Sequence, residues 1–311
     1  MLSVSDLAIF PIKSLPGVHV EQAVAGGRGL EHPRLPGVRD RAMMVVDSHG
    51  RFITSRTHAK ALSKITVTLD ESAGTLNLVA RDVDVSDVLR IDVSGASIED
   101  GVVGIHTEQS KVKVWEWEGP AAVVDRVWFS KVLDQEVTLV RCLEQMDRPV
   151  DPEYAPGEQT GFSDGFPYLF VFEESLCDLF ADTHGESAAL SMMGRFRGNI
   201  VVAGGEPWRE DGLERLTCRA SGVSFSLCKP CSRCTVPGID PETGEADSRV
   251  VELLRRRRSG GVLGWTEGPR GFKHATFFGV NAVLTRDDTG GVDGTAGGRP
   301  VVSVGDQLLV A

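Results

Sequence analysis

Three cysteines lie at a regular spacing in "CKPCSRCTVPGIDPETGE", the stretch from Cys228 to Glu245. Cys228, Cys231 and Cys234 are each separated by two residues, and thiolates so spaced could bind a metal or form a disulfide. Structural zinc sites and iron–sulfur clusters normally take four ligands, yet the seven histidines include no H-x₃₋₅-H pair. Adding Cys218 gives C-x₉-C-x₂-C-x₂-C, which fits neither common ferredoxin pattern. Three interpretations therefore stay open: a catalytic metal with open positions, one important thiolate with bystanders, or reduced thiols packed in a turn.

The composition excludes several classes of function. The chain of 311 residues has a net charge of −11, which argues against binding to nucleic acid or to an anionic membrane surface. No run of about 18 apolar residues is present to span a membrane. The start "MLSVSDLAIFPIKS" contains Asp6 and no basic region, so it predicts a strand and not a signal peptide. We therefore expect a cytoplasmic protein with reduced thiols.

Short β-branched runs, broken by glycine, proline and acids, dominate the first half of the chain. Hairpins are expected over residues 43–54 and 64–80, and single strands over 88–95 and 111–119, where Trp115 and Trp117 share one face. This rhythm predicts an antiparallel β-rich domain.

Helical patterns are fewer. Short helices are expected near 130–135 and over 172–185, the second with Leu176, Leu179 and Phe180 on one apolar face. A longer helix follows Asp247 or Ser248 as its cap. The arginine run 255–258 is expected to be a solvated last turn near the negative end of the helix dipole, with an anion site as the alternative. The glycine-rich stretch 287–300 predicts a surface loop, because it lacks the ending of a phosphate-binding loop.

Several motifs occur together in a fixed order along the chain. They are "FPIKSLPGV" (10–18), "LPGVRDRAMMVVDSHGRFITSR" (35–56), "GFSDGFPYLFVFEES" (161–175), "GRFRGNIVVAGGEPWREDG" (194–212), "CSRC" (231–234), "DPETG" (240–244) and "FFGVNAVL" (277–284). As a set they resemble the MOSC family of molybdenum-cofactor proteins. The nearest branch is that of the mitochondrial amidoxime-reducing component and its bacterial relatives, and the resemblance covers essentially the whole chain.

The resemblance implies a mainly β fold with a few helices. An N-terminal, MOSC-like β-rich domain would span residues 1–130, and a MOSC β-barrel domain would span residues 131–311. The stretch up to about residue 45 would reach across to the cofactor site in the barrel.

The same resemblance implies a molybdenum–molybdopterin cofactor and no role for pyridoxal phosphate. The implied activity is the reduction of N-hydroxylated compounds by N–O bond cleavage at molybdenum, with electrons from a separate flavin or iron–sulfur reductase. Cys234 is implied as the metal ligand and catalytic residue. Asp164 is the candidate catalytic proton donor, with a metal-bound hydroxide as the alternative. The implied cofactor-binding residues are Lys13, Ser14, Arg41, Ser163, Arg197, Asn199, Ser232, Arg233 and Asn281. Asn281 stands where the amidoxime-reducing relatives carry a tyrosine.

Two other functions remain open from the residues. A sulfur-carrying member of the same family would hold a persulfide on Cys231 or Cys234. A structural binding module would instead hold zinc with Cys228, Cys231 and Cys234.

Overall fold

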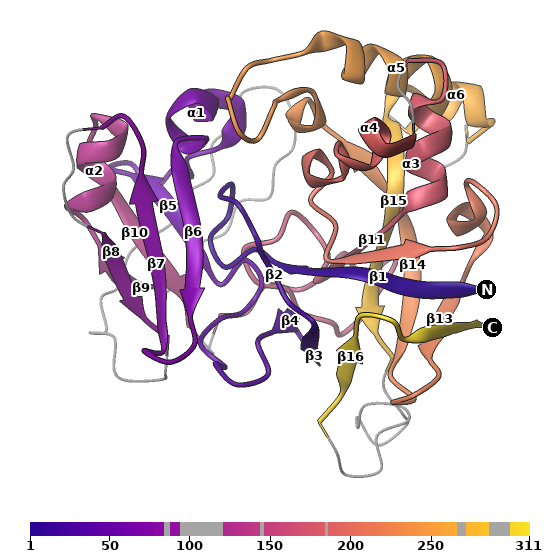
Figure 1. Ribbon diagram of the computed structural model, residues 1–311, viewed down its shortest axis with the longest axis horizontal. Coiled ribbons are helices and arrows are strands. Elements are labelled where there is room, and N and C mark those ends of the chain that lie inside the picture. Colours follow the sequence, from indigo (N-terminus) through magenta and orange to yellow (C-terminus); the bar gives the residue numbers. More distant parts are fainter. Residues whose placement is uncertain (84–87, 94–120, 144–145, 184–185, 266–271, 286–298) are drawn as a thin grey trace.

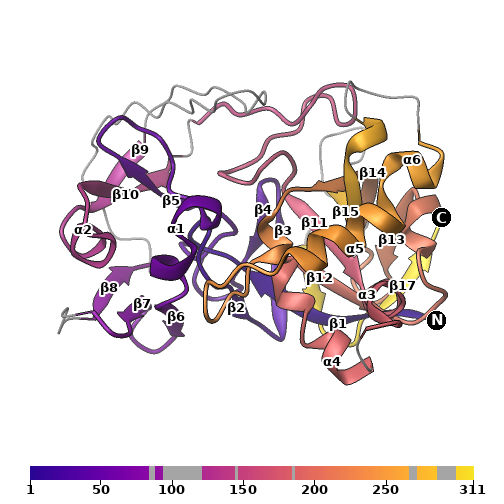
Figure 2. The ribbon, with the colours of Figure 1, turned by 90° about the horizontal axis from the view of Figure 1, so that it is seen from above.

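The computed structural model describes all of residues 1–311 except 84–87, 94–120, 144–145, 184–185, 266–271 and 286–298. Two β-rich parts lie side by side (Figures 1 and 2). One contains α1, α2 and β5 to β10, and the other contains β1 and β11 to β17 with the helices α3 to α6 on its outside. The fold is mainly β with a few helices, as predicted.

A closed barrel forms the larger part. Counted over the described residues, seven strands close it in the order β12-β11-β15-β14-β13-β17-β1, because β1 also pairs with β12. These strands are β1 (Leu2–Ile9), β11 (Tyr168–Phe172), β12 (Ile200–Ala203), β13 (Arg215–Cys218), β14 (Ser224–Arg233), β15 (Thr276–Leu284) and β17 (Gln307–Val310). Alternate side chains face opposite sides: Phe170 and Phe172 pack into the interior, whereas Val171 packs against the outer helices.

The outer helices cover one side of the barrel. They are α3 (Glu173–Phe180), α4 (Glu186–Leu190), α5 (Ser248–Arg258) and α6 (Gly260–Leu263). Leu176, Leu179 and Phe180 of α3 are buried on one face, as predicted. None of the helices in the described part of the chain has the length and apolarity needed to cross a membrane.

The structure corrects the interpretation of the arginine run on α5. The helix begins as predicted, with the Asp247 side chain accepting from the Arg249 backbone N–H at 3.0 Å. Arg257 is paired with Asp178 and the buried Arg258 with Asp211. Only the first two arginines of the run, 255 and 256, are exposed. Half of the run therefore holds the helix to neighbouring segments, and the other half faces solvent.

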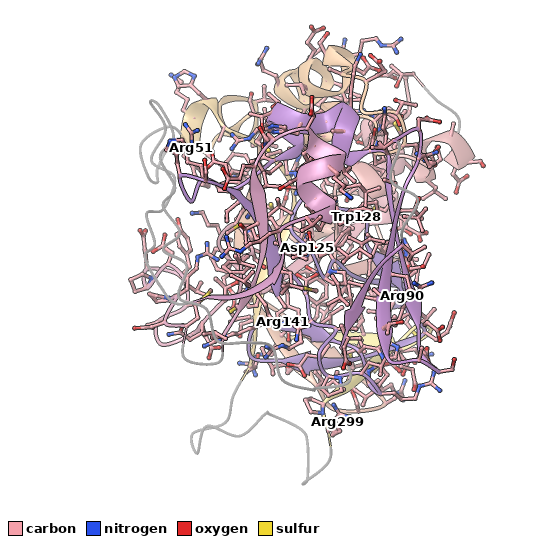
Figure 3. All side chains as sticks on the ribbon, turned by 90° about the vertical axis from the view of Figure 1, so that its left-hand side faces the viewer. Arg51, Arg90, Asp125, Trp128, Arg141 and Arg299 are labelled. Atoms are coloured by element: carbon pink, nitrogen blue, oxygen red, sulfur yellow. The ribbon has the colours of Figure 1, made fainter. Side chains whose placement is uncertain are left out.

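The smaller part consists of two three-stranded sheets and two helices. Its elements are β5 (Met43–Asp47), α1 (Ser55–Leu62), β6 (Ile65–Asp70), β7 (Thr75–Ala80), β8 (Leu89–Asp92), β9 (Ala121–Asp125), α2 (Trp128–Leu133) and β10 (Val137–Cys142). Asp125 lies at the start of α2 beside Trp128 (Figure 3) and accepts from the backbone N–H groups of Trp128 and Phe129. The hairpin over 64–80 is confirmed. The return strand expected over 51–54 forms only one isolated bridge, Val46 to Phe52. The strand expected over 111–119 and most of the 287–300 loop lie outside the described residues.

A further small sheet accompanies the barrel, and the two parts share one core. β16 (Val301–Ser303) pairs with β3 (Gln22–Gly26), which pairs with β4 (Gly29–Glu31), and β2 (Val18–His19) pairs antiparallel with β1. One apolar cluster contains both Phe170 of the barrel and Leu76 of the smaller part. The expected division after residue 130 falls within α2, and the following β10 pairs with β5 and β9. We therefore propose a division after Cys142, which keeps that sheet whole.

A buried carboxyl group makes stability depend on pH. Glu210, in the short helix η2 (Arg209–Gly212), is 2% exposed and accepts from Ser175 Oγ at 2.8 Å. Burial raises its pKa from 4.5 to about 7, so the unfolded chain ionises first as the pH rises and the folded state loses relative stability between these values. Glu210→Gln removes this ionisation. Between about pH 5 and pH 8, its free energy of unfolding should rise relative to that of the parent protein by about 2–3 kcal/mol. Chemical denaturation of both proteins at both pH values measures their free energies of unfolding. If the variant and the parent differed by the same amount at pH 5 and pH 8, the prediction would be wrong.

Candidate functional site

Cys234 follows the last residue of β14 and is exposed. β14 holds Arg233 opposite Thr276 of β15, which fixes the backbone directly before Cys234. Cys228 and Cys231 are only partly exposed, and Cys228 donates to the Ser226 carbonyl at 3.3 Å. Burial raises the pKa of the Cys228 thiol. Within the described residues no three His, Cys, Asp or Glu side chains gather as a metal site would require, so the geometry gives the zinc interpretation no support.

Three arginines that the sequence predicted lie in one contiguous group. Arg41 and Arg197 each place their guanidinium carbon 4.4 Å from the centre of the Phe10 ring. Arg41 also donates to the Arg197 carbonyl at 3.2 Å. Arg233 donates to the Phe196 carbonyl at 2.8 Å and stands 5.5 Å from the Phe196 ring. Since Phe196 precedes Arg197 and Arg233 precedes Cys234, these contacts run without a break from Arg41 to the exposed thiol.

Three predicted residues have an unusual backbone conformation. Ser14, Arg41 and Arg197 have φ values of 70°, 45° and 55°, in the left-handed region that side chains other than glycine seldom adopt. Only six non-glycine residues in the described part of the chain have a positive φ, and these three are half of them. Such conformations cost about 1 kcal/mol or more each and concentrate at functional sites. The left-handed backbone of these three residues therefore supports their place in a functional site, independently of their side-chain contacts.

One buried carboxylate balances the arginine group. The Asp40 side chain is fully buried and accepts from the Phe10 backbone N–H at 2.9 Å and from Arg41 Nη1 at 2.5 Å. Burial, together with the neighbouring Arg41, lowers the pKa of Arg197 to about 9. The group keeps more positive than negative charge, so it favours an anionic ligand.

Lys13 and Asp164 form an ion pair beside this group. Lys13 is buried, and its Nζ donates to Asp164 Oδ1 at 2.5 Å and to the Phe162 carbonyl at 2.7 Å. Burial lowers the pKa of Lys13, although Asp164 opposes that shift. The Lys13 ammonium is the main cause that lowers the pKa of Asp164, whose side chain is 90% exposed. Asp164 is therefore ionised near neutral pH, and it must first accept a proton before it can donate one.

Arg148 hydrogen-bonds to the loop 161–164, which contains Asp164. The sequence patterns did not point to this residue. Its guanidinium is buried and donates to the carbonyls of Gly161, Ser163 and Asp164, the last at 3.0 Å. Burial lowers its pKa to about 10. The Ser163 hydroxyl is buried and has no hydrogen-bond partner within the described residues. A single arginine in a polar stretch carries no spacing signal, so only the folded chain identifies its role.

The remaining predicted residues are placed differently. Asn199 is buried, donates to the Ala8 carbonyl and accepts from the Leu169 N–H, both at 3.2 Å. It therefore joins β1, β11 and β12, and its side chain is already engaged by the backbone. Ser232 is exposed on β14, and Asn281 lies partly buried on β15 between β11 and β14.

A pocket lies between the two parts of the molecule, next to the arginine group. Ser14 and Ser55 line it from the N-terminal side, and Arg195, Arg197 and Asp240 line it from the C-terminal side. Ser14 and Arg197 thus connect the pocket to the site described above.

Comparison with known proteins identifies relatives over most of the chain. The model of the MOSC N-terminal beta barrel domain matches residues 1–136, and that of the MOSC domain matches residues 157–308. Mitochondrial amidoxime-reducing component 1 of Homo sapiens is 28% identical over 270 residues, which are 82% of this chain and 72% of that protein. Its Mus musculus counterpart is 26% identical over 270 residues, 82% of this chain and 71% of that protein. Molybdenum cofactor sulfurase of Solanum lycopersicum is 26% identical over 281 residues, 83% of this chain but only 32% of that longer protein.

Proposed function

Because the chain belongs to the MOSC family, we propose that it is a molybdenum-cofactor-dependent oxidoreductase that reduces N-hydroxylated compounds. The observation that carries this proposal is the exposed Cys234 thiol, linked through Arg233 to Arg197 and Arg41. The similarity to the mitochondrial amidoxime-reducing components supports the choice of reaction.

The donor set suits a phosphorylated pterin cofactor. Several guanidiniums gather around one buried carboxylate, and two buried polar atoms, Ser163 Oγ and Arg195 Nη1, have no partner within the described residues. A soft thiolate such as that of Cys234 suits molybdenum, while Ser14, Arg41 and Arg197 would hold the anionic and polar edges of the pterin. When bound, this cofactor would supply the two-electron chemistry of N–O bond cleavage.

The chain's own residues would bind and orient the substrate, and they would deliver protons to it. Reducing an N–OH group to N–H consumes two electrons and two protons and releases water. The ionised Asp164 carboxylate, held by Lys13 and open to solvent, would accept protons from water and pass them toward the substrate. A separate flavin or iron–sulfur reductase would supply the electrons.

Sulfur transfer is the second candidate. The match to molybdenum cofactor sulfurase favours it, as does the Cys231 thiol, which accepts from Arg233 Nη1 at 3.2 Å. A guanidinium beside sulfur stabilises a thiolate or a persulfide anion. In this function the cysteine thiolate would take the outer sulfur of a persulfide on a separate donor, whose S–S bond breaks and whose inner sulfur leaves as a thiolate.

Elemental analysis and turnover together test the proposal. The protein is purified from a host that makes molybdopterin, and molybdenum, zinc, iron and phosphorus are measured per chain. Turnover of an amidoxime or a hydroxylamine is then measured with a chemical reductant, so that no partner protein is needed. Molybdenum near one atom per chain with turnover is expected. A persulfide on Cys231 or Cys234 without molybdenum would favour sulfur transfer, and stoichiometric zinc would overturn both.

A further inference from the structure

One side of the pocket between the two parts is formed by a loop that contacts α1. Its wall near Asp240 continues into the loop 240–245, which packs against α1. An added Cβ at Gly244, where φ is 71°, would stand 2.7 Å from the Ala59 carbonyl, so only glycine permits this approach. Lys60 and Glu245 form an ion pair at 3.0 Å across the same contact. Figures 1 and 2 show this segment before α5 extending to α1.

Arg195 lines this pocket, and one of its two terminal guanidinium nitrogens is hydrogen-bonded. The side chain is 10% exposed, and Nη2 donates to Asp240 Oδ2 at 2.7 Å. Asp240 is itself fixed by the backbone N–H groups of Glu242 and Thr243, at 2.9 and 3.0 Å. Arg195 Nη1 is buried and has no hydrogen-bond partner in the described part of the chain. The guanidinium is thus held in place while a buried donor remains unsatisfied, which is costly unless a ligand accepts from it.

The neighbouring groups favour an anion as that ligand. Arg197 also lines the pocket, and no carboxylate within the described residues pairs with its guanidinium at salt-bridge distance. Ser14 adds a hydroxyl group, whereas the Ser55 hydroxyl donates to the Ser14 carbonyl at 3.2 Å. Asp240 is the one acidic residue of the lining, and Arg195 already neutralises it.

We propose that Arg195 is the principal anchor of a phosphate subsite in this pocket, with Arg197 and Ser14 beside it. This assignment rests on the proposed function in so far as the phosphate belongs to the pterin cofactor. Lys13 is not part of this subsite, because it lies outside the pocket lining and is engaged by Asp164 and the Phe162 carbonyl. Lys13 becomes a residue that positions Asp164. A guanidinium with one edge on Asp240 and one free nitrogen matches a phosphate monoester.

The first experiment uses protein from a host without molybdopterin and inorganic phosphate as the probe. Phosphate should raise the melting temperature of the parent protein, and Arg195→Gln should weaken phosphate binding by about tenfold or more. The control is Arg249→Gln, because Arg249 is also paired with an aspartate, Asp247, but on the exposed surface. This control should bind phosphate as the parent does. Equal binding by the parent and by Arg195→Gln would overturn the proposal.

The second experiment uses protein from a host that makes molybdopterin and measures bound pterin and phosphorus per chain. Arg195→Gln should retain about tenfold less pterin than the parent or Arg249→Gln. If the parent binds phosphate through Arg195 but never retains pterin, the subsite stands for a free phosphate ester and the proposed function fails. If parent and variant retain equal pterin, the function stands and the subsite is wrong. Should Arg195→Gln fold poorly, Arg195→Lys keeps the ion pair with Asp240, and the same loss of phosphate binding is expected.

Discussion

Replacing Cys234 by serine should lower turnover of an N-hydroxylated substrate by about 100-fold or more, because a hydroxyl is a poor ligand for a soft metal. The exposed side chain makes few contacts, so the melting temperature of the cofactor-free protein should change little. Molybdenum per chain should fall in parallel with turnover. Activity with a chemical reductant and elemental analysis of the same preparation measure both.

The matched control for this prediction is Cys228→Ser. Cys228 lies on the same strand, but it is partly buried and donates to the Ser226 carbonyl, a bond that serine can also make. It should keep both molybdenum and turnover. Full turnover by Cys234→Ser would rule out the assignment of that thiol as the metal ligand.

Replacing Asp40 by alanine should lower the free energy of unfolding by about 3–5 kcal/mol, because it removes one partner of a buried ion pair. The Asp40 carboxylate is fully buried, and its loss removes the acceptor of Arg41 Nη1 and of the Phe10 N–H. Arg41 and Arg197 would then repel each other without the buried carboxylate between them and the backbone of Phe10. Chemical denaturation of the cofactor-free protein measures the change.

Glu245→Ala is the control for this second prediction. Glu245 pairs with Lys60 at 3.0 Å, but both side chains are mostly exposed, at 68% and 74%, so the loss should be at most about 1 kcal/mol. Asp40→Asn should be intermediate, because an amide oxygen still accepts from the Phe10 N–H. A cost of Asp40→Ala no greater than that of Glu245→Ala would show that this carboxylate does not stabilise the site.

Local patterns predicted several of the elements. Alternation over 64–80 predicted β6 and β7, and the spacing of Leu176, Leu179 and Phe180 predicted the buried face of α3. These patterns work because each depends on residues a few positions apart. The pairing of β10 with β5 depends instead on contacts between distant segments, which a local pattern does not contain.

The site was predicted unevenly for the same reason. Family resemblance pointed to Arg41, Arg197 and Arg233, and the structure places them in one group. Motif matching alone does not distinguish a side chain that faces a ligand from one that is already satisfied by the backbone, as Asn199 is. Arg148 and Arg195 act through partners about 13 to 45 positions away along the chain. Arg195 lies within the motif 194–212, but that motif does not reveal its pairing with Asp240.

The position of β1 has a consequence for how the protein is made. A ribosome synthesises β1 long before its barrel neighbours β12 and β17, and Leu2 pairs with Leu308. At common rates of translation, the apolar side chains Leu2, Leu7 and Ile9 would wait on the order of ten seconds for β12 to emerge. The barrel therefore closes only after translation has passed β17, and pairing between segments so far apart is slow. The nascent chain should depend on chaperones that bind exposed apolar strands, and slower translation should increase its loss to aggregation.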